Sequence, residues 1–130
     1  MILFKLLTAD LRSPFVHPAS ALQYARRKWT AAPAGPLYCY ESAEAALRAA
    51  GGFAEAWEVE AELWDGPHIE AIRGFIYSPD ELAQFWAWVQ HEVDAGRDPS
   101  AYALRIRAAE SPTVLARRIR LIRRIRDKRR

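Results

Sequence analysis

Cysteine and histidine are scarce in this sequence of 130 residues. Cys39 is its one cysteine, and its three histidines are His17, His68 and His91. A single thiol forms no internal disulfide and no multi-thiolate metal site, and no two histidines have the spacing that places two metal ligands on one helix face. We therefore expect no metal and no cofactor. Cys39 lies between two tyrosines in an apolar segment, where core packing is a better interpretation than nucleophilic catalysis.

Long apolar runs are missing as well. No stretch approaches the roughly 20 apolar residues of a membrane-spanning helix, and the first ten residues lack the apolar core of a signal peptide. We therefore expect a cytoplasmic protein without a membrane span. Gly51 and Gly52 lack the spacing of a phosphate-binding loop, and Glu58, Glu60 and Glu62 alternate as a solvated strand face does, so we expect no catalytic residues and no enzyme.

Charge is unevenly distributed along the chain. From Arg105 onward there are eleven basic residues against two acidic ones, a net charge of +9, whereas the first 104 residues carry eight basic and fourteen acidic residues, a net charge of −6. Blocks of one sign usually serve a partner of the opposite sign. The partner of the basic block is either another molecule or the acidic body of this chain.

Four segments have the pattern of strands. Residues 2–7 and 37–41 are short apolar runs, and residues 55–63 alternate strictly between apolar and acidic side chains. This third strand should bury Trp57, Val59 and Leu63. A turn at residues 65–67 predicts a hairpin between 55–63 and an antiparallel partner within residues 68–77.

Helices are expected between and after these strands. Residues 19–29 predict a short helix with Arg26, Arg27 and Lys28 at its solvated end. Residues 43–50 predict an alanine-rich helix that ends at Gly51. A capping box that begins at Ser78 opens a helix ending at Gly96, with Trp88 as a candidate exposed aromatic, and residues 100–110 predict a further helix.

The segment 111–130 is the most unusual one. Plotted at about 100° per residue, its apolar side chains share one arc and most of its basic side chains share the other, as in an amphipathic helix that begins with a Ser-Pro cap. The apolar stripe should pack against Trp88 and neighbouring helices or against a second copy, which makes a homo-oligomer possible. The expected basic face consists of Arg117, Arg120, Arg123, Arg124, Lys128 and Arg130.

These elements predict an α+β fold: a small, mostly antiparallel sheet with helices packed on one face and a C-terminal helical extension. Residues 1–96 would form the α+β body, and residues 97–130 would form the helical extension that ends in the basic amphipathic helix. Together they suit one domain.

The amino-terminal half also resembles a known family. Residues 12–15 (Arg-Ser-Pro-Phe) after the first strand, then Trp29, Cys39 and residues 57–60 (Trp-Glu-Val-Glu) are similar to a family of small proteins of unassigned activity that is frequent in actinobacteria and their phages. The second cysteine and nearby histidine often found in that family are missing here. The resemblance implies a phage or mobile-element setting and no particular mechanism.

Two functions are compatible with the sequence. In the first, a non-enzymatic binding protein contacts the phosphate backbone of nucleic acid through the basic face of its last helix, because guanidinium groups match phosphate geometry. In the second, the same helix docks on an acidic protein surface, as in an interaction module or inhibitor of a host protein.

Overall fold

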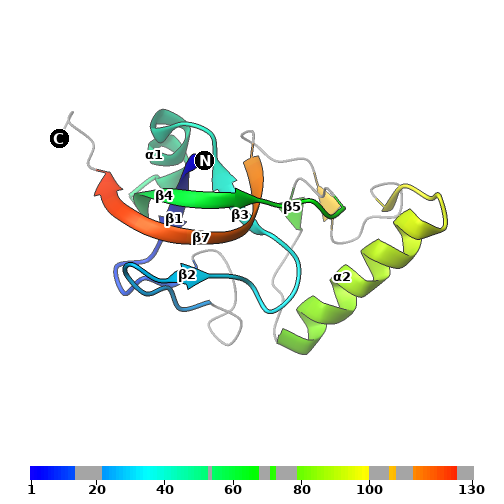
Figure 1. Cartoon of the computed structure of the whole chain (residues 1–130). Coiled ribbons are helices and arrows are strands. Elements are labelled where there is room, and N and C mark those ends of the chain that lie inside the picture. The colour runs from blue at the N-terminus through cyan, green and yellow to red at the C-terminus, as the bar shows by residue number, and fades with distance from the viewer. Residues whose placement is uncertain are drawn as a thin grey trace.

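One antiparallel sheet forms the centre of the molecule (Figure 1). The computed structural model describes residues 1–13, 22–52, 54–67, 71–72, 79–99, 106–107 and 113–125. The strands of the main sheet follow the order β2-β7-β3-β1-β4. Their bounds are β1 Ile2–Leu7, β2 Trp29–Thr30, β3 Leu37–Tyr40, β4 Glu55–Leu63 and β7 Thr113–Ile125. The predictions of strands at 2–7, 37–41 and 55–63 are confirmed.

The expected C-terminal helical extension is wrong. Thr113–Ile125 is strand β7, and it pairs with β2, β3 and β4. Three of the apolar side chains that were expected to line a helix face, Leu115, Ile119 and Leu121, are buried in the sheet core instead, whereas Ile122 is 48% exposed. They therefore cannot provide the helical surface that was expected to hold copies together.

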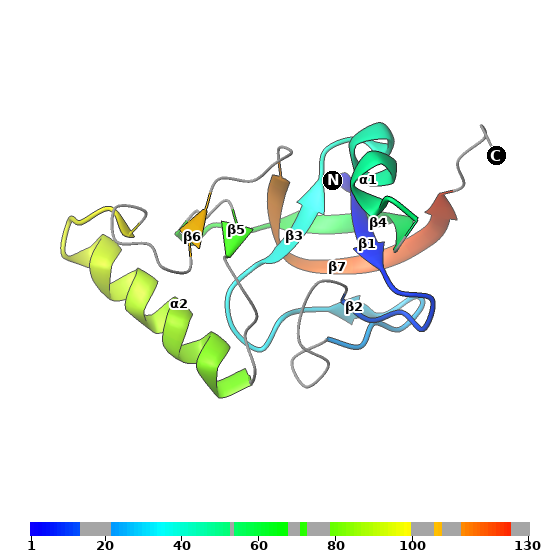
Figure 2. The same ribbon diagram turned by 180° about the vertical axis from the view of Figure 1, so that it is seen from behind.

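Strand β7 also closes the sheet. Its first residues pair with β3, and the stretch from Ala116 to Ile125 pairs with β4, so that β1, β3, β7 and β4 form a closed ring. Two register shifts against β4 leave Arg117 and Ile122 as extra residues. Such bulges bend a strand and strengthen its twist, which fits the pronounced curve of β7 around the other strands (Figure 2).

The inner side of the closed sheet holds the main core. Its members include Leu3 and Leu7 from β1, Trp57 and Val59 from β4, and Ile119 from β7. Trp57 and Val59 are buried as predicted, whereas Leu63 at the end of β4 is 49% exposed and that part of the prediction is wrong.

Helix α1 (Ala43–Ala50) covers the outer side of β1 and β4 (Figures 1 and 2). Ser42 caps it, with its hydroxyl accepting the amide of Ala45 at 3.1 Å, and Gly51 ends it at φ 55°. Ala46 and Ala50 pack there with Leu6 in a second cluster. The predicted helix at 43–50 is confirmed.

Helix α2 (Pro79–Asp94) lies apart from α1, beside the segment that leads into β3 (Figure 1). Phe85, Trp86 and Val89 form a third cluster there, and the Trp86 ring meets the Trp64 ring edge-on with 6.1 Å between centroids. The Trp86 ring also packs directly on Gly35, which no larger residue would permit, because a Cβ at position 35 would lie 2.2 Å from Trp86. Trp88 is 36% exposed, in accord with its prediction.

Three smaller expectations are wrong where the structure describes them. Ala71–Ile72 is strand β5, but it pairs with strand β6 (Ile106–Arg107) and not with β4, whose neighbours are β1 and β7. Strand β6 also replaces the helix expected at 100–110, of which the remaining residues lie outside the described ranges. Residues 22–29 contain no helix, so the short helix expected at 19–29 is wrong over this part.

In the ranges covered by the structure, no helix is long and apolar enough to cross a bilayer.

Candidate functional site

A row of ion pairs joins the basic strand β7 to the acidic face of β4. The glutamates that alternate along β4 each meet an arginine across the strand pair: Glu62 with Arg118 at 2.5 Å, Glu60 with Arg120, and Glu58 with Arg123 at 3.1 Å. Arg124 pairs with Glu55 at 3.0 Å, and Arg117 with Asp65. We call these five pairs the Arg–Glu ladder. The acidic body of the chain is thus itself a partner of the basic segment.

The ladder is a surface feature. Glu60 and Arg120 are 40% and 42% exposed, and Arg123 is 69% exposed. Hydrogen bonding from Arg118 lowers the pKa of Glu62, and the same bond raises the pKa of Arg118. Trp29 adds to this surface, because the guanidinium groups of Arg118 and Arg120 lie 4.4 and 5.1 Å from its ring centroid.

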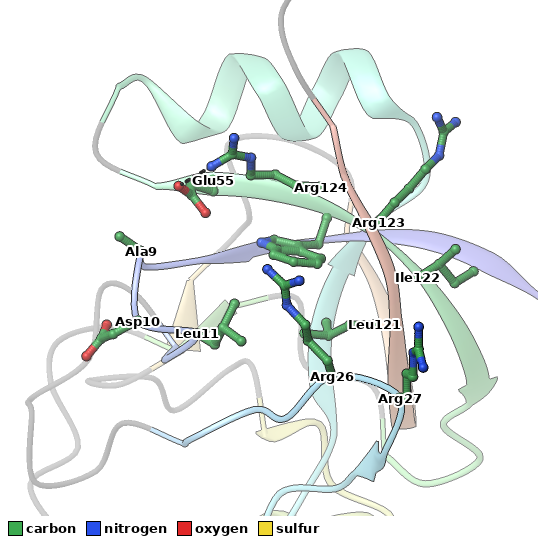
Figure 3. Close-up of a pocket in the computed structure, with 11 residues that line it drawn as sticks. Ala9, Asp10, Leu11, Arg26, Arg27, Glu55, Leu121, Ile122, Arg123 and Arg124 are labelled. Atoms are coloured by element: carbon green, nitrogen blue, oxygen red, sulfur yellow. Dashed lines mark hydrogen bonds and ion pairs between the residues drawn. The ribbon is translucent and has the colours of Figure 1, made fainter.

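At one end of the ladder the surface is hollowed into a pocket of about 810 Å³ (Figure 3). Three parts of the chain build it: the loop after β1, the segment before β2, and the paired ends of β4 and β7. We call it the basic pocket, because four guanidinium groups and two carboxylates line it. Its lining residues are Ala9, Asp10, Leu11, Arg26, Arg27, Glu55, Trp57, Leu121, Ile122, Arg123 and Arg124.

Arg26 and Arg27 differ from the arginines of the ladder. Within the described ranges, neither forms an ion pair with a carboxylate, while Arg124 is held by Glu55, as the dashed line in Figure 3 shows. The Arg26 guanidinium lies 5.4 Å from the centroid of the Trp57 ring. Trp57 itself is only 5% exposed, and its Nε1 finds no hydrogen-bond acceptor among the residues described. The pocket therefore has an excess of hydrogen-bond donors.

The wall of the basic pocket is held in a strained but well-supported conformation. Of the non-glycine residues described, only Leu11 and Arg27 have a positive φ, 62° and 63°, and both line this pocket. A positive φ is uncommon for residues other than glycine. The Gln23 side chain supports the wall by donating to the carbonyls of Asp10 and Leu11 at 2.9 and 3.1 Å.

Asp10 is the exposed carboxylate of this wall. Its pKa is lowered, chiefly because the Thr8 hydroxyl donates a hydrogen bond to it, so it is charged at neutral pH. A ligand of the basic pocket would therefore meet two guanidinium groups that have no carboxylate partner in the described chain, and the charged carboxylate of Asp10, which also lies 3.4 Å from Nε of Arg12. This combination suits an anion that also carries hydrogen-bond donors, and it suits a simple polyanion less well.

The structure divides the six residues that the sequence proposed as a nucleic-acid face. Arg123 and Arg124 line the basic pocket, while Arg117 and Arg120 lie in the ladder beyond it. Lys128 and Arg130 lie outside the described residues. Arg26 and Arg27 were not proposed as site residues, although the run Arg26-Arg27-Lys28 was a sequence signal that could have indicated them.

Other chemistry is sparse in the described part of the chain. No group of three His, Cys, Asp or Glu side chains comes together there to hold a metal ion. Cys39 is fully buried, and this burial raises its pKa to about 11, which keeps the thiol protonated. Comparison with protein families, with curated proteins and with solved structures found no match.

Proposed function

We propose that this chain is a non-enzymatic nucleic-acid-binding protein whose contact surface is centred on the basic pocket. Arg26, Arg27 and Arg123 would contact phosphates, and Arg124 would complete the surface. The observation that carries the proposal is the excess of guanidinium groups around one hollow, two of them without an ionic partner in the described chain. Guanidinium groups bind phosphate through paired, charge-assisted hydrogen bonds.

The ladder explains why the proposed surface is smaller than the basic segment. All five arginines of the ladder, Arg123 and Arg124 included, have a carboxylate partner, so a phosphate must displace that partner before it gains a full charge pair. Arg123 is the most exposed of the ladder arginines, and Arg26 and Arg27 at the same end of β7 have no carboxylate partner among the described residues. A phosphate backbone would therefore bind at this end of β7 in preference to its middle.

Both functions expected from the sequence relied on a C-terminal helix, and both lose that route because the segment is strand β7. We therefore propose the nucleic-acid contact at the basic pocket instead, and a protein-interaction module remains the alternative prediction. A cytoplasmic location and a phage or mobile-element setting remain predictions. So does a contribution of Lys128 and Arg130 to the same surface.

The test is a titration of fluorescein-labelled DNA with the purified protein at several salt concentrations. If about four arginines engage single-strand phosphates, the slope of log affinity against log salt should be near −3, from roughly −0.7 per phosphate. The double variant R27A/R123A should flatten the slope by about 1.4. Arg48→Ala serves as the matched control, because Arg48 is an exposed arginine on α1 that pairs with Glu44 away from the pocket. Absence of binding at low salt would refute the proposal.

A further inference from the structure

The last residues of strand β7 pair on one side only in the part of the chain that the structure describes. Residues 122–125 pair with β4. On the opposite side, β3 and β2 pair with earlier residues of β7, and the last contact is an isolated bridge between Arg26 and Leu121. A turn follows at once, in which Arg27 has a φ of 63° and the Lys28 amide donates to the Ala25 carbonyl at 3.4 Å, so β2 does not continue along β7. We call the unpaired side of residues 122–125 the β7 edge.

The basic pocket lies along the β7 edge. Four successive residues of β7 line it: Leu121, Ile122, Arg123 and Arg124. Successive side chains of a strand point to opposite faces, and here Leu121 is buried in the core while Arg123 lies on the outer face with the ladder. A hollow that touches both kinds of side chain lies beside the strand and not on one of its faces. Figure 3 shows Arg123 pointing away from Arg26 and Arg27, so the basic groups are spread along the edge and suit an extended ligand.

An unpaired strand edge offers main-chain N–H and C=O groups to another extended chain. The molecule itself shows which side chains such a chain needs, because β4 already pairs with this part of β7 and presents Glu58 to Arg123. Arg120 shows that one arginine of β7 can serve neighbours on both sides, since it pairs with Glu60 on β4 and lies 5.1 Å from the Trp29 ring centroid on β2. An acidic side chain at the β7 edge could meet Arg123 from its other side in the same way.

The charge beside the β7 edge selects the kind of chain. Arg26 and Arg27 have no carboxylate partner among the described residues, so a carboxylate there would gain a charge pair without displacing another. Ile122 is 48% exposed and offers an apolar contact between the basic groups. A peptide with alternating acidic and apolar side chains matches this arrangement, and its main chain supplies hydrogen-bond donors as well. A second copy of β7 is a poor occupant, because its arginines would lie opposite these arginines.

We propose that the β7 edge binds an extended acidic segment of another protein, which adds a strand to the sheet beside residues 122–125 and directs its carboxylates toward Arg26, Arg27 and Arg123. This inference goes beyond the proposed nucleic-acid function, because its ligand is recognised through main-chain hydrogen bonds. Both ligands would use Arg26 and Arg27, so each should exclude the other.

The probe is a fluorescein-labelled synthetic peptide with the sequence of residues 55–63, the segment that already complements β7 in the fold. Its matched control has the same composition with the four glutamates placed in one block, which keeps the charge and removes the alternation. Fluorescence anisotropy should show about tenfold tighter binding of the alternating peptide, the effect of roughly one net main-chain hydrogen bond. Arg27→Glu should weaken its binding by about three- to tenfold, because a repulsion replaces an attraction. Arg48→Glu, at an exposed arginine of α1, should leave it unchanged.

Amide hydrogen exchange, measured residue by residue by NMR, shows whether the bound peptide forms a strand. Saturation with the alternating peptide should slow the exchange of main-chain amides within residues 122–125, because amides that enter a strand ladder are protected. The amides of helix α1 (Ala43–Ala50) should exchange as before. The block peptide should give no such protection, since attraction between charges requires no main-chain pairing.

The outcomes separate this inference from the proposed nucleic-acid function. Equal affinity for the two peptides, without protection of residues 122–125, would overturn strand addition and leave the nucleic-acid function to its own titration with DNA. Protection by the alternating peptide in a protein that binds no DNA at low salt would support the β7 edge and overturn the nucleic-acid function. Where both bind, an oligothymidylate should displace the labelled peptide, and simultaneous binding of the two would overturn the shared use of Arg26 and Arg27.

Discussion

Exchanging the charges of Glu60 and Arg120 would test the pairing of β4 with β7 directly. The two residues are register partners, and their side chains form an ion pair while each remains about 40% exposed. A pair this exposed contributes about 0.2 to 1 kcal/mol, and like charges opposite each other cost a similar amount. Either single reversal, E60R or R120E, should therefore destabilise the protein, and the double reversal should recover most of the loss. The coupling free energy across the cycle should be about 1 to 2 kcal/mol, because two attractions replace two repulsions.

Urea denaturation followed by tryptophan fluorescence gives the free energy of unfolding of each variant at low salt. Raising the salt should reduce the coupling, since the pair is exposed. As a matched control, E60R combined with R48E should show coupling below about 0.5 kcal/mol, because Arg48 lies on α1 and pairs with Glu44. If E60R and R120E were as independent as this control, the strand register would be refuted and the helical interpretation of the basic segment would regain support.

Three other measurements address the core and the titrating groups. Trp57→Ala should lower the free energy of unfolding by about 3 to 5 kcal/mol, because the side chain is buried in the main core. Trp88→Ala, at a position 36% exposed, should lower it by under about 1 kcal/mol in the same urea assay. Equal losses in the two variants would contradict the placement of Trp57. Arg118 lowers the pKa of Glu62 in the folded protein, so the charged Glu62 carboxylate stabilises the fold. This stabilisation is present above the unfolded-state pKa and is lost as the pH falls through the folded-state pKa. Glu62→Gln should therefore lose less stability than the wild type between about pH 6 and pH 3. Cys39 should react with a disulfide reagent only as fast as the protein opens, since the thiol is buried and its pKa is raised to about 11; rapid labelling of the native protein at neutral pH would contradict its burial.

Local patterns predicted strands β1, β3 and β4 and helix α1 correctly. The alternation at 55–63, the cap at Ser42 and the stop at Gly51 are signals that depend only on neighbouring residues, and the structure has those elements at these positions. The pairing of β4 was not predictable in the same way, because its partners lie at the two ends of the chain. The turn at 65–67 suggested a local hairpin, which competes poorly with the long, charge-matched partner offered by β7.

The error at the carboxyl end has a specific cause. Between Arg118 and Leu121 the strand alternates strictly, with Ile119 buried between two arginines. Bulges at Arg117 and Ile122 then shift the alternation by one residue on either side. The two bulge residues lie five positions apart, and each one shifts the inward–outward alternation of the side chains by one residue. With these shifts the apolar residues fall on one arc of a helical plot, so the sequence has the pattern of an amphipathic helix although the segment is a strand.

The candidate site was only partly predictable for a related reason. Charge density indicated the basic segment, and it correctly raised the possibility that the acidic body is its partner. It did not indicate the pocket, because Arg26, Arg27 and Asp10 meet β7 only after the sheet has closed. Their own local sequences contain no signal that they would come together.

The bulge at Ile122 connects the fold to the proposed site. Upstream of it, Arg118 and Arg120 point outward with the glutamates of β4, and Leu121 points into the core. If Ile122 were an ordinary residue of the ladder of strand pairs, it would point outward, Arg123 would take the inner position and Arg124 the outer one. Because Ile122 is an extra residue instead, Arg123 pairs outside with Glu58, and Arg124 lies opposite Trp57 and pairs with Glu55 at the pocket wall. One inserted residue thus places Arg123 on the outer face and Arg124 beside Trp57, so that the last two arginines of the Arg–Glu ladder also line the basic pocket.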